Sequence, residues 1–202
     1  MRKMMTAAFA ATLFAVPAHA QDSSGLAGFK LGAIAGYDSV KLELDGDSGS
    51  KGGFAYGLTA GYDVDLGGAI LGIETEISDS TAEENVSDVV VPGDRASLVT
   101  GRDLYVGARI GFAASDNVLL FAKGGYTNAR VKLKYNDGTS SLTEGDNLDG
   151  YRLGGGAEYV SGPIFGRLEY RYSDYGEYSY AGVGTGLKAS RHQVVFAGGY
   201  RF

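Results

Sequence analysis

The chain has no cysteine, only three prolines, and no apolar run after its N-terminal segment that approaches the length of a membrane-spanning helix. The lack of cysteine excludes disulfide-stapled secreted domains and thiolate metal sites. Proline interrupts the hydrogen bonding of a central strand, and Pro17, Pro92 and Pro163 all fall outside the segments that alternate like strands. A spanning helix needs about 20 apolar residues. The chain also lacks the basic footprint of nucleic-acid-binding proteins, so we expect no nucleic-acid partner.

Residues 1–20 have the pattern of a secretory signal peptide. Two basic residues precede an apolar segment, residues 7–16, which is too short to span a membrane and is followed by small residues. The expected cleavage-site residues are Ala18, Ala20 and Gln21. Removal of Arg2 and Lys3 changes the formal charge from −6 to −8. We expect an exported, mature chain, residues 21–202, whose length of about 180 residues suits one domain.

The mature chain is rich in glycine and tyrosine, with 33 and 14 of these residues in the full sequence, and it lacks helical periodicity. Eight segments instead alternate with a period of two residues, which is typical of strands. The predicted strands are residues 29–44, 54–64, 69–78, 102–113, 118–135, 151–160, 164–175 and the C-terminal segment that ends at residue 202.

The connections between these segments alternate in length. Residues 65–68, 114–117 and 161–163 are tight turns, whereas residues 45–53, 79–101, 136–150 and 176–189 are longer and polar. Short turns at one end and long loops at the other are typical of outer-membrane barrels, whose turns face the periplasm. The pattern predicts an all-β protein, an eight-stranded antiparallel up-and-down transmembrane β-barrel with both termini in the periplasm.

Alternation alone does not say which face points outward, because a soluble ligand-binding barrel alternates too. Here the charged residues share a face with most strand glycines, and the other face carries large aromatic side chains. An arginine facing lipid at mid-membrane costs about 2–4 kcal/mol. The charged face is therefore predicted to be the lumen, which in an eight-stranded barrel is just wide enough for side chains.

The lumenal face is predicted to carry seven cations balanced by seven carboxylates. They are Lys30, Arg109, Lys123, Arg152, Arg167, Arg171 and Arg201, with Asp38, Asp63, Glu74, Glu76, Asp103, Glu158 and Glu169. Buried charges persist when they are paired and hydrogen-bonded. We expect a structural polar network that fills the lumen, and the alternative is a charged gate in a narrow pore.

Enzymatic function is not expected. The mature chain has one histidine, His192, so a Ser-His-Asp arrangement would depend on a residue that we expect to be solvated near the end of the last strand. Glu74 and Glu76 share a face and could act as an acid and a base, but nearby arginines favour a structural role. No catalytic residue, metal site or cofactor is predicted.

Several motifs resemble a known family, the small opacity-type outer-membrane proteins of alphaproteobacteria. The resemblance lies in residues 71–74, 108–112, 123–126, 154–159, 166–176, His192 and 199–202. It implies an eight-stranded barrel with OmpA- and OmpX-like architecture, located in the outer-membrane lipid of a Gram-negative cell envelope. It also implies insertion by the barrel-assembly machinery, which recognises the aromatic terminal strand. The corresponding residues here are Phe196, Tyr200 and Phe202.

The resemblance implies a role in envelope integrity, with host contact in some members. We therefore expect a structural or surface-interaction barrel, with any surface ligand bound through the polar loops. A narrow, porin-like diffusion channel is the alternative, and a ligand binder, soluble or at the barrel mouth, is a third hypothesis. The chain ends at Phe202 without a peptidoglycan-binding domain, so a cell-wall tether is not expected.

Overall fold

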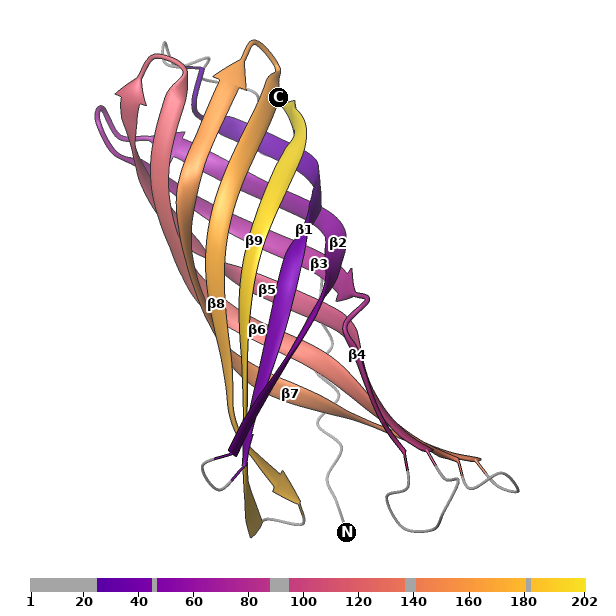
Figure 1. The fold of residues 1–202 in the computed structure, drawn as a ribbon. Helices are drawn as coiled ribbons and strands as arrows, with labels where there is room; N and C mark the ends of the chain where they lie inside the picture. Colours follow the sequence, from indigo (N-terminus) through magenta and orange to yellow (C-terminus); the bar gives the residue numbers. More distant parts are fainter. Residues whose placement is uncertain (1–24, 45–46, 88–94, 137–140, 181–182) are drawn as a thin grey trace, which may run out of the picture.

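The structure is a computed structural model that describes residues 25–44, 47–87, 95–136, 141–180 and 183–202. The described residues form nine strands (Figure 1). They are β1 (Gly28–Leu44), β2 (Asp47–Asp65), β3 (Ile70–Ser80), β4 (Glu83–Ser87), β5 (Arg95–Ser115), β6 (Val118–Asn136), β7 (Ser141–Ser161), β8 (Ile164–Tyr180) and β9 (Val183–Arg201). No helix among these residues is long and apolar enough to cross a membrane.

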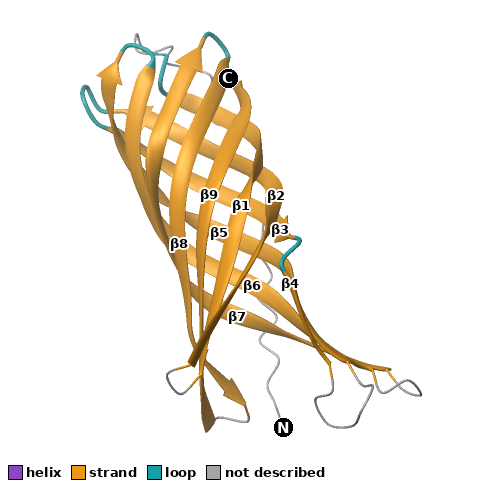
Figure 2. Cartoon of the chain, in the orientation of Figure 1, coloured by secondary structure: helices purple, strands orange, loops and turns teal. Residues whose placement is uncertain are grey.

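All neighbouring strands are antiparallel, and the sheet closes on itself (Figure 2). β1 pairs with both β2 and β9, so the first and last strands lie side by side. β3 and β4 follow one another along β5 and act as one strand of the wall. The pairing of β3 with β5 closes the ring. The predicted eight-stranded antiparallel barrel is thus confirmed.

The barrel wall has an apolar outside and a polar inside. On β3, Ile73 is 67% exposed, whereas its neighbour Glu74 is 2% exposed. The same alternation continues along the strand, because successive side chains point to opposite faces. This burial is the inverse of a soluble barrel, in which the apolar face is inside.

The predicted long loops are wrong in extent, because most of their described residues belong to paired strands. β1 and β2 remain paired out to Leu44 and Asp47, and β6 and β7 out to Asn136 and Ser141. β4 also lies within the predicted loop 79–101. The extensions that the prediction missed here include residues 47–53 of β2 and 141–150 of β7, which are mostly Ser, Gly, Asp, Asn, Thr and other polar residues, so they lack the apolar alternation that reveals a membrane-spanning strand although their backbone pairing continues.

The wall divides beyond the barrel into two four-stranded sheets. Pairing between β2 and β3 ends at Ala55 and Ser80, and pairing between β7 and β8 ends at Tyr151 and Asp174. Past these points β2, β1, β9 and β8 form one sheet, and β4, β5, β6 and β7 form the other (Figure 1). We call this the hairpin end, and the opposite end, with turns at 66–69, 116–117 and 162–163, the turn end.

Buried apolar side chains form a cluster inside the barrel. Its members are Leu26, Ile34, Ile70, Leu119, Val160, Phe165, Val195 and Ala197. Ile70, Leu119, Val160 and Phe165 lie at the strand ends that flank the short turns, so this part of the cluster lies at the turn end. The charged residues occupy the lumen between this apolar layer and the hairpin end.

Candidate functional site: a charged network inside the barrel

The structure buries every one of the fourteen side chains predicted to face the lumen, none of them more than 5% exposed. They come from all parts of the wall, including β1, β2, β3, β5, β6, β7, β8 and β9. Within each strand these residues occupy alternate positions, so their side chains point to the same, inward face. The sequence therefore brings these residues together even where they are far apart in the chain.

Lys123 is the centre of the network. Its Nζ atom lies 2.7 Å from a carboxylate oxygen of each of Glu74, Glu76 and Glu169. These side chains belong to β6, β3 and β8, so the contacts cross the lumen rather than follow one strand pair. The Tyr105 ring lies beside the ammonium, with its centroid 4.9 Å from Nζ.

The same three glutamates have the spacing of a metal site, with one oxygen from each within 4.8 Å of the others. Lys123 Nζ, however, is within hydrogen-bonding distance of all three carboxylates. Its ammonium already supplies the positive charge that such a cluster needs. We therefore describe the group as a lysine with three carboxylates rather than as a metal centre.

Toward the hairpin end, arginines connect the carboxylates of different strands. Arg152 contacts Glu76 at 3.2 Å and Asp103 at 2.5 Å. Arg191 contacts the same Asp103 at 2.9 Å and Asp38 at 2.6 Å. Neutral side chains complete these contacts. Thr127 Oγ1 and Tyr175 Oη donate hydrogen bonds to Asp103. Ser173 Oγ accepts a hydrogen bond from Arg152 Nε, and Gln193 Oε1 accepts one from Arg171 Nε.

Toward the turn end, the network continues through Asp63 and Glu158. Lys30 Nζ donates to Asp63 at 3.0 Å. Glu158 accepts from Arg109 at 3.0 Å and from Arg201 at 2.5 Å, so one carboxylate joins two arginines. The Arg109 guanidinium also lies over the Phe121 ring, 4.5 Å from its centroid, and Arg167, which donates to Glu74, lies 5.4 Å from the same centroid.

The predicted charge balance is wrong, because the prediction omitted Arg191. This residue is 1% exposed and makes two ion pairs. The described lumen therefore holds eight cations and seven carboxylates. Arg191 lies two positions before Gln193 on the inward face of β9, so the alternation could have identified it. The sequence does not reveal it readily because residues 176–189 have the composition of a polar loop, so Arg191 stands at the apparent start of the last strand, although β9 begins at Val183.

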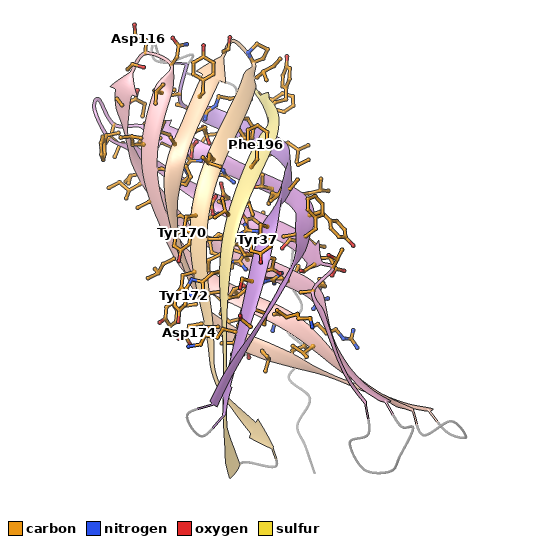
Figure 3. All side chains as sticks on the ribbon, viewed as in Figure 1. Tyr37, Asp116, Tyr170, Tyr172, Asp174 and Phe196 are labelled. Atoms are coloured by element: carbon orange, nitrogen blue, oxygen red, sulfur yellow. The ribbon has the colours of Figure 1, made fainter. Side chains whose placement is uncertain are left out.

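His192 lies on the outside of the barrel and within a strand, not near a strand end as predicted. β9 begins nine residues before it, at Val183. Its Nδ1 atom is 2.8 Å from Tyr170 Oη, and the Tyr172 ring centroid lies 4.9 Å from the histidine ring. Figure 3 shows Tyr170, Tyr172 and Asp174 following one another along β8 toward the hairpin end.

Aromatic side chains gather on the outer wall near both of its ends. Tyr37, Tyr56, Tyr126, Tyr151 and Tyr170 are exposed toward the hairpin end, and Phe29, Tyr62, Phe112, Tyr159, Tyr200 and Phe202 toward the turn end. Between them the wall carries mainly aliphatic and small side chains, with Phe196 as an aromatic exception. Two aromatic girdles around an apolar band are typical of barrels that span an outer membrane, since aromatic rings favour the membrane interface.

Comparison with known families gives a match over residues 6–202, nearly the whole chain. The matching family is described as the outer membrane protein β-barrel domain. The chain belongs to this family. It is therefore an outer-membrane β-barrel protein, and its charged network lies inside a membrane-spanning barrel.

Two relatives of this outer-membrane barrel come from alphaproteobacteria, as the sequence resemblance predicted. They are the 31 kDa outer-membrane immunogenic proteins of Brucella melitensis and Brucella suis, each 29% identical over 145 residues. The match covers 67% of this chain and 60% of each relative. The chain thus spans less than two thirds of the length of these relatives.

Solved structures of other outer-membrane barrels have the same fold. Neisserial surface protein A has a TM-score of 0.54 at 16% sequence identity, with coverage of 87% of this chain and 97% of that protein. The attachment invasion locus protein Ail of Yersinia pestis has a TM-score of 0.50 at 16% identity, with coverage of 88% and 100%. At these identities the likeness concerns the fold alone.

The aromatic residues of the last strand of this outer-membrane barrel face outward. Phe196, Tyr200 and Phe202 are 57%, 48% and 70% exposed. Phe202 N donates to Phe29 O at 2.8 Å, and the rings of these two residues are 5.7 Å apart. The chain end is thus held against the first strand at the turn end. Ala18, Ala20 and Gln21, the predicted cleavage-site residues, lie outside the described part of the chain.

Proposed function

We propose that this protein is a structural and surface-interaction component of the outer membrane, with a lumen filled by side chains. The observation that supports this proposal best is the contact of Lys123 with three carboxylates from β3 and β8. These ion pairs cross the lumen, so a permeating ion would have to displace them. Separating buried charge pairs is costly because the partners lose compensation in a region with little water.

Planar-bilayer recording tests the proposal. We expect the inserted wild-type barrel to show no steady unitary conductance, because the lumenal ion pairs block the path. Insertion should be verified on the same vesicles by comparing the electrophoretic mobility of boiled and unboiled samples, and a general porin serves as a positive control. Steady, reproducible current steps that scale with the amount of folded barrel would contradict the filled lumen and favour the narrow diffusion channel.

The two sheets at the hairpin end provide the surface for external contacts. Short turns face the periplasm in outer-membrane barrels, so we orient the turn end toward the periplasm and the hairpin end toward the outside. The closed barrel ends where β2 stops pairing with β3, at Ala55 and Ser80, and where β7 stops pairing with β8, at Tyr151 and Asp174. Beyond these residues the paired strands of the two sheets continue and support the external surface. Surface loops that connect strands commonly carry binding functions, and the loops at the hairpin end are the part of the barrel that an external partner would meet first.

We also propose that the barrel-assembly machinery recognises the C-terminal strand through its outward aromatic residues. Deletion of Phe202, or Phe202→Asp, is expected to slow insertion and to reduce membrane yield several-fold, because the terminal ring next to Phe29 and Tyr200 is lost. The measurement is the initial rate of folding into vesicles that contain the purified machinery, followed by the mobility shift of unboiled samples.

Leu66→Asp is the matched control for the Phe202 variants. Leu66 is 61% exposed in a turn at the same end of the barrel, so the substitution adds the same charge without changing the terminal strand. An insertion rate for Phe202→Asp equal to that of Leu66→Asp would show that the terminal aromatic residue is not the assembly signal.

A further inference from the structure

A β-bulge near the hairpin end brings two arginines together on the outer wall. The register between β5 and β6 shifts between Thr100 and Asp103, so Gly101 and Arg102 lie opposite Arg130. Both arginine side chains are exposed and point outward. Side chains directly opposite each other on antiparallel strands have Cβ atoms about 5 Å apart, and like charges in such positions destabilise the pairing.

Neither arginine forms an ion pair with a carboxylate of the described part of the chain. No carboxylate there lies within ion-pair distance of Arg102 or Arg130, and neither side chain makes a hydrogen bond to a described residue. A pair of opposed cations without a counter-ion is unfavourable unless another group carries the negative charge. The pair therefore has the electrostatics of an anion-binding position.

The nearby outer carboxylates, in contrast, already accept hydrogen bonds. Asp79 accepts from Ser80 N at 2.7 Å, and Asp149 accepts from Asn128 Nδ2 at 2.6 Å and from Tyr126. Asp174, further around the wall, accepts from Gly176 N at 2.8 Å and from Tyr172 Oη at 3.0 Å. These carboxylates stay ionised, and Asp79 lines the same depression as Arg102, but no ion pair joins any of them to the two guanidinium groups, whose donors therefore remain available to an anionic ligand.

The arginine pair borders the apolar band. Leu104, Val106, Ile110 and Phe112 follow Arg102 along the outward face of β5, and each is exposed. Arg102 also borders a shallow depression on the outer wall, whose other lining residues are Tyr56, Gly57, Ile77, Ser78 and Asp79. A ligand that fits this surface has an anionic group joined to an apolar chain.

We propose that Arg102 and Arg130 bind a phosphate group of lipid A, the phosphorylated anchor of lipopolysaccharide in the outer leaflet. Guanidinium groups bind phosphate oxygens through paired, charge-assisted hydrogen bonds. With the hairpin end toward the outside, the pair lies at the outer boundary of the apolar band. An acyl chain of the lipid then lies against Ile77 and Leu104, and Tyr56 lies at the interface. This site goes beyond the filled lumen and does not depend on it.

The test is direct binding of diphosphorylated lipid A to the folded barrel in detergent micelles, measured with a fluorescent form of the lipid. Arg102→Gln and Arg130→Gln should each weaken binding by roughly tenfold, because each removes charge-assisted hydrogen bonds. The double variant should weaken it more. Dephosphorylated lipid A should bind the wild-type barrel about as weakly as the phosphorylated lipid binds the double variant.

The control is the double variant Lys41→Gln with Lys51→Gln, which removes the same formal charge from the β1–β2 hairpin. It should bind lipid A like the wild type. Three results would overturn the site: equal affinity of the wild-type and double-arginine variants, equal affinity for phosphorylated and dephosphorylated lipid, or an equal loss in the lysine control. The last result would show that net charge alone attracts the lipid. All variants should first show the mobility shift of a folded barrel.

Discussion

Lys123→Met should lower the free energy of unfolding of the barrel by about 3–5 kcal/mol, the usual cost of removing one partner of a buried ion pair. Methionine has nearly the length of lysine, so the substitution removes the ammonium with little change in volume. Glu74 and Glu76 keep arginine partners, but Glu169 is left with Arg167, whose Nε atom is 3.4 Å away. Three carboxylates then face one another with one cation fewer between them.

Urea titration of the refolded barrel in detergent micelles measures this change, with the compact band of unboiled samples as the signal for the folded state. Lys51→Met is the matched control, because Lys51 is exposed on the β1–β2 hairpin. An exposed ion pair contributes at most about 1 kcal/mol. If the two variants unfold at the same urea concentration, the charges around Lys123 do not hold the barrel together.

A second substitution separates loss of charge from loss of packing. Glu169→Gln in the Lys123→Met background removes one of the carboxylates that lost its partner. The double variant should be more stable than Lys123→Met alone, with a coupling energy of about 0.5–3 kcal/mol between the two sites. An additive result would attribute the destabilisation to packing around residue 123.

The sequence predicts the two faces of the wall well because a strand repeats every two residues. On β3, Leu71, Ile73 and Ile77 alternate with Glu74 and Glu76, and the structure exposes the first set and buries the second. This pattern also predicts which side faces lipid, since charge is tolerated there only at a high free-energy cost. The whole predicted lumenal set follows from that single physical rule.

The pattern cannot predict where the strands end or which charges meet. Beyond the membrane both faces of a hairpin can be polar, so the signal that marks a strand disappears while pairing continues, as in residues 47–53 of β2. Contacts across the lumen depend on the stagger of all strands in the closed ring. Arg152, for example, donates to Glu76, which is 76 residues away in the chain.

The lumen also depends on glycine at positions where two strands and their charged side chains crowd together. Gly156 on β7 lies between Phe121 on β6 and Glu169 on β8 in the pairing register. A Cβ atom at this position would lie 2.9 Å from Glu169 Cα and still closer to Leu168 O. These are backbone atoms of the neighbouring strand, so they cannot move aside as a flexible side chain could.

Gly156→Leu is therefore expected to prevent folding or to destabilise the barrel by at least about 3 kcal/mol, because overpacking adds to the displacement of a charged partner of Lys123. Gly156→Ala, which adds the Cβ atom alone, should cost about 1–3 kcal/mol. The measurement is the same urea titration, together with the yield of the compact unboiled band.

Gly166→Leu is the control that separates crowding in the lumen from the loss of a glycine. Gly166 points toward lipid, and a Cβ atom there would meet the Phe196 ring at 3.4 Å, an ordinary contact. This variant should fold with a stability close to that of the wild type, since leucine favours the lipid-facing surface. Equal stability of Gly156→Leu and Gly166→Leu would mean that the wall can expand around the added side chain, and that the charged network is not packed tightly enough to block the lumen.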